Sequence, residues 1–475
     1  MKERFKTFLL LSLVSMSIII TQKLWMQVPN QMFNLFDEEL EASSSYVLSD
    51  MISPNKYLLN FNSKNHTLVY DDSKYGMWLT SRGSLADILS TKNATIDTLS
   101  NGEYLNYQNE KSVVFYFPEK ISTYILTKAW NIKKPNSIVD TMPNIDSIYI
   151  YLGNGDPFFV FTHGEEHISV YDDSIDLQRL KIEMDKIGDE KGYIYYYSMR
   201  ETLGTQNDIF IPYSIDNSLP EIHVANEIAS LDYGEKDELA ERFFNKSIDY
   251  IRGIVESNGS SIYVYNQRVL KFNINGTIEY FNALDEPVNE SNLYKSLLSA
   301  SNFLSEKAGV QKGMYLAKVE NIQSDNSQGY RFTFRYRIRG IPVILGNQEV
   351  GEYVKMEVFN NHIRSYKYYA RRDMNKVPKK IIENKSMMSA FDAIDKNYSL
   401  LEELYLYNNK DKLEEEIGKD NIVNQVLSSI EDITLAYFDP CLKDRDEKLI
   451  TVWVIKFNGR ILAFDAYNGI LVYER

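Results

Sequence analysis

KDELAERFFNKSIDYIRGIVESNGSSIYVYNQRVLKFNINGTIEYFN, residues 236–282, contains the two periodicities that indicate the fold class. Its first part predicts a short helix that ends in Phe243 and Phe244, and the rest predicts several strands. An aromatic ligand platform is one interpretation of these ring-rich strands. The regular turns favour instead a twisted antiparallel sheet that buries alternate aromatic residues, and hence an α+β fold. The turns fall at Asn258-Gly259, Asn266-Gln267 and Asn275-Gly276.

A helix followed by a meander is also predicted twice nearer the carboxy terminus. Residues 293–309 and 386–399 each place apolar side chains at helical spacing, and each is followed by four segments of strand character. Such a unit buries one face of its sheet under its helix, and two units can pair into a larger domain. We therefore expect residues 290–475 to form a C-terminal domain. The expected strands are 315–322, 330–338, 352–359 and 362–369, then 433–438, 449–457, 461–465 and 470–473.

The 475-residue chain is too long for one hydrophobic core, and its length suggests about three domains. We expect an N-terminal α+β domain at 46–171 and a middle α+β domain at 172–289. In the first, the pattern predicts strands at 56–61, 66–70, 112–117 and 147–152, and a helix at 84–98. In the second, it predicts an amphipathic helix from Ile175 to Ile187 and a strand at 192–198.

His163, Glu166 and His167 spell H-x-x-E-H, the order found in one class of zinc peptidase. That chemistry needs both histidines on one face of a helix, with the glutamate beside them. Here β-branched and aromatic runs flank the motif, and Gly164 lies inside it. The pattern favours a hairpin turn over a metal site, so neither a metal nor a catalytic residue is predicted.

Composition excludes several other classes of function. The net charge of −14 argues against nucleic acid as a partner, because phosphates attract a basic surface. The one cysteine, Cys441, permits no internal disulfide and no thiolate cluster. Its surroundings, DPCLKDRDEK, suggest an exposed loop. No cofactor and no small-molecule substrate are predicted.

The amino terminus is typical of a membrane-targeting segment, since basic residues precede the apolar run FLLLSLVSMSIII. Bulky residues follow this run where a cleavage site needs small ones, so an uncleaved anchor is favoured over a cleaved signal peptide. We expect a cytoplasmic tail at 1–6, a transmembrane signal anchor at 7–25 and a juxtamembrane stalk at 26–45. The residues expected to anchor this segment are Lys2, Arg4, Lys6, Lys23 and Trp25.

Charge also predicts the orientation of this anchor. Basic residues lie before it, whereas Asp37, Glu38, Glu39 and Glu41 follow it. The amino terminus is therefore expected in the cytoplasm and the rest of the chain outside, as in a single-pass protein of the cell membrane.

A basic stripe stands out in this acidic chain within RFTFRYRIR, residues 331–339. Alternation places its arginines on one face of a strand. A solvated sheet face is the simpler interpretation, and a surface for an acidic partner or an anionic envelope polymer is the alternative. The arginines of this strand are Arg331, Arg335, Arg337 and Arg339, and they begin a wider basic stretch that also includes Arg364, Lys367, Arg371, Arg372, Lys376, Lys379 and Lys380.

Together these pieces resemble the YycH family, also called WalH. The resemblance extends over essentially the whole chain and is strongest in residues 236–282. Its other parts are the basic start, the anchor with a Lys-Leu-Trp boundary and the W-x-I-x-F-N-G-R…F-D-A-Y-N-G end. The resemblance implies three extracytoplasmic domains behind one membrane anchor, with a C-terminal domain like that of YycI. It also implies that the chain, with a YycI-like partner, regulates a YycG/WalK-type sensor histidine kinase that controls cell-wall metabolism.

An anchor lying beside a kinase's transmembrane helices needs only a small differential contact energy, since about 1.4 kcal/mol changes a two-state ratio tenfold. Small polar residues in the anchor permit close helix packing, although chance placement explains them equally well. The candidate contacts are Ser12, Ser15, Ser17 and Thr21. The resemblance predicts a noncatalytic regulator and leaves open whether it activates or inhibits. The competing hypotheses are an anchored zinc peptidase and a structural protein that binds envelope polymer.

Overall fold

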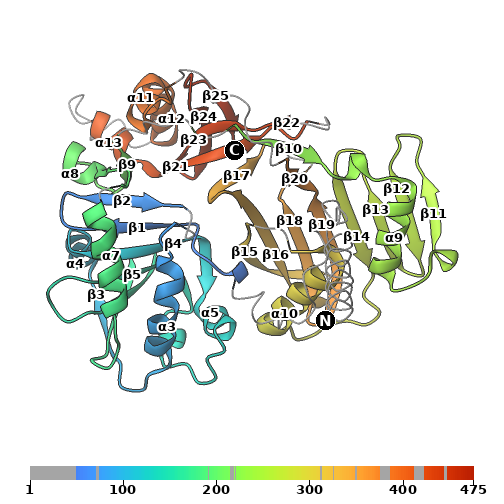
Figure 1. Cartoon of the computed structure of the whole chain (residues 1–475), viewed down its shortest axis with the longest axis horizontal. Helices are drawn as coiled ribbons and strands as arrows, with labels where there is room; N and C mark the ends of the chain where they lie inside the picture. The colour runs from blue at the N-terminus through green and yellow to red at the C-terminus, as the bar shows by residue number, and fades with distance from the viewer. Residues whose placement is uncertain are drawn as a thin grey trace, which may run out of the picture.

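The computed structural model describes residues 50–70, 74–190, 192–213, 219, 221–310, 313–324, 326–347, 350–374, 386–410, 422–442 and 447–475. Over these residues the chain is mixed α+β, with three sheets and helices packed on them (Figure 1). The predicted anchor and stalk lie outside the described residues. Within the described ranges, no helix is both long and apolar enough to cross a membrane.

The first sheet contains nine described strands, and every neighbouring pair in it is antiparallel. Long alternating segments form its centre, as the sequence predicts. The order across the sheet is β3 (Thr95–Leu99), β7 (Glu166–Tyr171), β6 (Phe159–His163), β5 (Asn144–Tyr151), β4 (Ser112–Ser122), β1 (Lys56–Asn60), β2 (His66–Val69), β8 (Tyr196–Ser198) and β9 (Phe210–Pro212).

One face of this sheet packs against helices. Trp78 on the first of them meets Phe115 of β4 edge to face, with ring centroids 5.0 Å apart. The opposite face carries a smaller core around Tyr149 and Tyr104, the latter from α4 (Asn101–Tyr107). Trp78 belongs to α3 (Met77–Ser90), and the other helices of this region are α5 (Thr123–Ala129), α6 (Ile138–Thr141) and α7 (Gln178–Glu190).

Two expectations about this region differ from the structure. The helix predicted at 84–98 ends at Ser90, because Thr91 adopts an extended backbone and the alternating Thr95–Leu99 segment pairs with β7 as an edge strand. The sheet also extends past residue 171, where the first domain was expected to end. Helix α7 packs on α3, and β8 and β9 continue the sheet.

The largest sheet has thirteen described strands and unites the middle and C-terminal parts of the chain. Strand β14 pairs with β19, and β17 pairs in parallel with β21. The order is β11 (Arg252–Val255), β12 (Ser261–Tyr265), β13 (Arg268–Phe272), β14 (Thr277–Asn282), β19 (His362–Tyr369), β18 (Val354–Phe359), β16 (Ser327–Ile338), β17 (Ile341–Leu345), β21 (Ile430–Asp439), β23 (Ile450–Phe457), β24 (Arg460–Asp465) and β25 (Leu471–Glu474), with β15 (Met314–Ser324) beside β16.

Helices α9 (Tyr233–Phe244) and α10 (Leu293–Phe303) cover one face of this sheet. Rings from both helices and from the sheet pack together there: Phe243 lies 5.7 Å from Tyr280 and 5.8 Å from Phe303 between centroids. The aromatic residues of 236–282 are thus largely interior, as the buried-sheet interpretation predicts. The asparagine turns are also found, since Asn266 and Gly276 have positive φ angles between the strands.

A second helical group packs on β21, β23 and β24, near the top of the molecule in Figure 1. Trp453 lies at its centre and donates from its indole nitrogen to the Met388 carbonyl at 2.9 Å. Met199 and Ile211, from the first region, belong to the same core. The helices are α11 (Ala390–Lys396), α12 (Tyr398–Asn408) and α13 (Ile422–Ser428), with α8 (Met199–Leu203) beside them.

A small three-stranded sheet lies between the two helix-and-meander groups. It consists of β20 (Arg371–Asp373), β10 (His223–Asn226) and β22 (Glu447–Lys448), which come from the end of one meander, the middle region and the second meander. Three short turns of helix complete the described elements: η2 (Ile228–Ser230), η3 (Ile248–Tyr250) and η4 (Leu304–Ala308).

Candidate functional site

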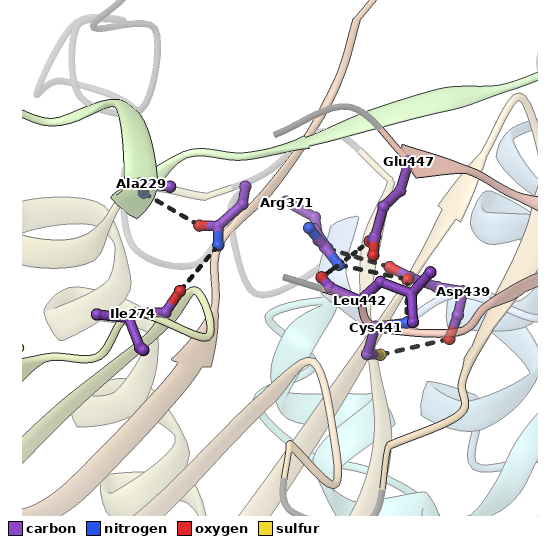
Figure 2. A network of polar contacts seen from close by, with 8 residues as sticks. Ala229, Ile274, Arg371, Asp439, Cys441, Leu442 and Glu447 are labelled. Carbon is purple, nitrogen blue, oxygen red and sulfur yellow. Dashed lines mark hydrogen bonds and ion pairs between the residues drawn. The ribbon is translucent and has the colours of Figure 1, made fainter. Parts of the chain in front are cut away.

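Among the described residues, the most deeply buried charged cluster joins this small sheet to the largest one. Arg371, at the start of β20, lies between Asp439 at the end of β21 and Glu447 of β22 (Figure 2). Its Nε donates to Asp439 at 3.2 Å, and its Nη2 donates to Glu447 and, at 3.1 Å, to the Leu442 carbonyl. The side chains of Arg371, Asp439 and Glu447 are 0%, 0% and 2% exposed. One guanidinium thus holds three separate segments of chain together.

The electrostatics of the cluster follow from this burial. Burial raises the pKa of the Asp439 carboxyl above its ordinary value, although the Arg371 guanidinium and the Cys441 amide oppose the shift. The guanidinium also lies 4.5 Å from the ring centroid of Tyr369. A cation that is hydrogen-bonded to two carboxylates and stacked on a ring has lost its water to fixed partners, so the cluster is suited to holding the two meanders in one arrangement.

Cys441 belongs to the same cluster, contrary to the exposed loop expected for its surroundings. Its amide donates to Asp439 at 2.7 Å, and the residue is 6% exposed. Burial raises the pKa of the thiol to about 12, which disfavours the thiolate form. A run of charges around a cysteine predicts exposure, but here Asp439 turns inward to meet Arg371.

A second polar region lies where the first sheet meets β15 and β16, and it contains the basic stripe. Arg335 contacts Glu352 at 3.1 Å and, across the seam, Glu119 of β4 at 3.6 Å. Lys318 contacts Glu119 at 4.0 Å. Both β4 and β15 have irregular register here, between Tyr116 and Ile121 and around Leu316, and a small hollow lies between them.

The four arginines of the stripe do not act alike. Arg331 forms an ion pair with Glu357 of β18 at 2.7 Å, on the same sheet. Arg337 donates to the Pro54 carbonyl at 3.0 Å and to the Ser53 hydroxyl at 3.2 Å. Arg339 lies beyond the strand in a turn, with φ near +52°. Binding of a polyanion by this stripe stays a prediction, and two of its members contact the first region of the same chain.

A contact of Lys56 with Asp432 completes what we term the N-terminal clamp, in which Arg337 and Asp432 hold Ser53, Pro54 and Lys56. Lys56 of β1 donates to the Asp432 carboxylate of β21, and its side chain is 8% exposed against 39% for Asp432. Burial alone would raise the pKa of Asp432, but the Lys56 ammonium and the Thr434 hydroxyl outweigh it, and the pKa lies below its ordinary value. The first described residues of the chain are therefore fixed to both C-terminal meanders.

The H-x-x-E-H residues lie on the hairpin that the sequence predicts. His163 ends β6 and pairs in register with Glu166, which begins β7. His167 is buried, stacks on Tyr104 at 4.1 Å and lies 3.1 Å from the Thr162 hydroxyl through Nδ1. A hairpin does not supply the one-face helical geometry that the zinc peptidase hypothesis requires. Among the described residues, no group of three or more potential ligands forms a metal site.

The remaining predicted residues lie outside the described part of the chain. They are Lys2, Arg4, Lys6, Ser12, Ser15, Ser17, Thr21, Lys23 and Trp25. Arg371 belongs to the basic stretch of the sequence, but neither its cluster with Asp439 and Glu447 nor the Lys56–Asp432 contact was predicted. A run of acidic residues after a strand gives no indication of burial, so only the long-range pairing of β10, β20 and β22 reveals the cluster.

No protein-family model matches the chain, and no curated protein matches it. Two solved structures are distantly similar. One, of an uncharacterized protein from Eubacterium rectale, has 14% identity and a TM-score of 0.33, and the match covers 56% of this chain and 90% of that one. The other, the YpeB C-terminal domain of Bacillus megaterium, has 12% identity and a TM-score of 0.25, with 52% and 97% covered. Likenesses of this size define no family.

Proposed function

We propose that this chain is a noncatalytic, membrane-anchored regulatory protein of the YycH (WalH) type. The α+β part of the chain lies outside the membrane, behind a single anchor. With a YycI-like partner, the protein modulates a YycG/WalK-type sensor histidine kinase that controls cell-wall metabolism. Contacts in the membrane and outside it both contribute to the regulation.

The observation that carries the proposal is the N-terminal clamp. Ser53 and Pro54 follow the expected stalk by a few residues and accept hydrogen bonds from Arg337 at 3.2 and 3.0 Å. Met51 and Ile52, beside them, are buried. A displacement of the C-terminal meanders would therefore act on the segment that leads to the anchor, through a path of few residues.

The energy required for such regulation is small. Two kinase states whose ratio shifts tenfold differ by about 1.4 kcal/mol in their contacts with the regulator. One hydrogen bond from a charged group contributes about 1.5–3 kcal/mol, so a clamp that alters even one contact between states is sufficient. The clamp provides several such bonds within six residues of the first described residue.

The first test is crosslinking of the full-length protein in its native membrane, followed by identification of the captured proteins. A matched form has residues 7–22 replaced by an unrelated spanning helix. Capture of a sensor histidine kinase by the native form, weakened by the replacement, supports regulation through the anchor. Capture that persists places the contact in the outer domains. Capture of no kinase by either form overturns the proposal.

The second test breaks the clamp while leaving the anchor intact. Arg337→Met removes both hydrogen bonds to the segment that follows the stalk, and we expect the transcriptional output of the kinase system to change severalfold. Arg331→Met is the control, because its ion pair with Glu357 lies within one sheet. Equal output from both variants, with both folded, would argue against transmission through the clamp.

A further inference from the structure

The exposed edge of the thirteen-stranded sheet has the features of a self-recognition strand. Strand β11 (Arg252–Val255) is the terminal strand, and each of its residues is exposed. Strand β11, at the right-hand edge of the molecule in Figure 1, contains no lysine, proline or bulge, although it is short and carries the charged Arg252. We propose that β11 pairs antiparallel with β11 of a second copy of this chain, about a two-fold axis that passes beside Ile254.

The direction of the backbone groups determines which residues can pair. The Glu256 amide donates to Ser260 at 2.8 Å, toward the sheet. Because successive residues of an antiparallel strand direct their amide and carbonyl groups to opposite sides, residues 252 and 254 also face β12, whereas Gly253 and Val255 face outward. A second strand therefore hydrogen-bonds through Gly253 and Val255, and only registers that oppose these two residues are possible.

Charge selects one of these registers. With Ile254 opposite its own copy, Gly253 opposes Val255 and Arg252 opposes Glu256 of the second chain, twice by symmetry. Centring the contact on Gly253 instead would oppose Arg252 to Ile254, and centring it on Val255 would oppose Ile254 to Glu256. The Ile254 register alone among these three gives two complementary charge pairs, and such pairs contribute to strand association when directly opposite.

In this register, each face of β11 also matches the same face of the second copy in shape and polarity. On the face away from α9, Ile254 is 39% exposed and lies across from Ile262 of β12. Glu256 is held on this same face by Lys271, at 3.0 Å. On the other face, Gly253 has no side chain, which leaves room for Val255 of the second copy, a residue that is 56% exposed.

The contact is a small one. Two Gly253–Val255 pairs supply four backbone hydrogen bonds, with two ion pairs and one isoleucine contact. An interface of this size is typical of a weak, reversible dimer that benefits from confinement to a common surface, such as a membrane. The inference concerns this edge alone and does not depend on the kinase proposal.

Disulfide trapping of the full-length protein in its native membrane tests the proposal. Ile254 forms a non-hydrogen-bonded pair with its copy, in which Cα atoms lie about 4.5 Å apart, within the range that a disulfide spans. Under mild oxidation, Ile254→Cys should give a covalent dimer. Tyr233→Cys, on the exposed surface of α9, should not, and the buried Cys441 of the unsubstituted chain should not either.

Further variants in the Ile254→Cys background separate pairing from chance collision. Val255→Pro removes an outward amide that β12 does not use, so it should abolish trapping while thermal unfolding is unchanged. Arg252→Glu and Glu256→Arg should each reduce trapping, by about tenfold for two repulsive pairs. When differently tagged copies of these two charge variants are expressed together, the mixed dimer should be recovered.

Three results would overturn the proposal. Trapping at Ile254→Cys that does not exceed Tyr233→Cys is the first, and trapping that is unaffected by Val255→Pro and by both charge variants is the second. The third is an Ile254→Cys adduct with a different protein only, which would show that the edge serves another partner. Recovery of the mixed charge dimer supports the register itself, since no other of these registers opposes residues 252 and 256.

Discussion

Arginines form ion pairs in two regions of the largest sheet and its surroundings, and the two regions differ mainly in their access to water. Arg371 lies between two carboxylates with no exposed side-chain surface, whereas Arg331 and its partner Glu357 are 30% and 21% exposed. Lys56 is 8% exposed, between Arg371 and Arg331, whereas its partner Asp432 is 39% exposed. The chemistry of the partners is similar throughout. Desolvation of the cation therefore decides what each contact contributes to stability, and the three contacts form a series graded by the exposure of the cation, from Arg371 through Lys56 to Arg331.

The largest effect is expected at the buried extreme. Arg371→Met leaves Asp439 and Glu447 buried without their cation, and we expect a loss of about 3–5 kcal/mol in the free energy of unfolding. Chemical denaturation followed by tryptophan fluorescence measures it. If desolvation is the cause, replacing all three residues together, as Arg371→Met, Asp439→Leu and Glu447→Met, should recover most of the loss. A loss below about 1 kcal/mol for Arg371→Met would show that the buried ion pairs contribute no more to stability than exposed ones.

A buried histidine of the first sheet extends the comparison to a group whose ordinary pKa, in the unfolded chain, lies near neutral pH. His66 is 2% exposed, and burial lowers its pKa to about 4, although the Ser63 carbonyl opposes the shift. The unfolded chain binds this proton near pH 6.5, so His66 contributes stability above that pH, which is lost as pH falls toward 4. The expected loss is about 3 kcal/mol between pH 7 and pH 4.

Urea unfolding of the wild type and of His66→Gln over this pH range checks the expectation. The difference between the two proteins should shrink, and can reverse, as the pH falls, because only the wild type must protonate the buried ring. His163→Gln, at the hairpin tip, controls for removal of an imidazole from the same sheet. Parallel pH profiles for the wild type and His66→Gln would contradict the burial argument.

An intermediate effect is expected at the N-terminal clamp. Lys56→Met removes a charged hydrogen bond to Asp432 whose acceptor is partly exposed, and we expect a loss of about 1–2 kcal/mol. A double-mutant cycle with Asp432→Asn isolates the coupling between the two groups. A coupling free energy as large as the loss in unfolding free energy for Arg371→Met would show that the exposure of these side chains does not predict what their contacts contribute.

The smallest effect is expected on the open face of the sheet. Arg331→Met breaks the pair with Glu357 where water can replace the lost partner, so the free energy of unfolding should fall by less than about 1 kcal/mol. The difference from the wild type should also diminish in about 1 M salt, where charges are screened within a few ångströms. A salt-independent loss of several kcal/mol would remove the distinction between the two regions.

The sequence predicted most accurately those features that depend on a single strand or a single turn. The H-G-E-E hairpin, the asparagine turns of 236–282 and the strands of both C-terminal meanders are found in the structure. It was wrong at residues 91–98, where a helical pattern runs into a strand, and at Cys441, where charged neighbours suggested exposure. Local periodicity reports which face of an element is apolar, but it does not report what covers that face.

The sequence by itself determined the α+β class, the positions of most strands and the hairpin that separates His163 from His167. These features depend on side-chain alternation and turn chemistry within a few residues. Tertiary structure alone decided that β14 lies beside β19, that β17 runs parallel to β21, and that Arg371 meets Asp439 and Glu447. These pairings join segments up to about ninety residues apart, and their free energy comes from desolvation and packing that exist only once the chain has folded.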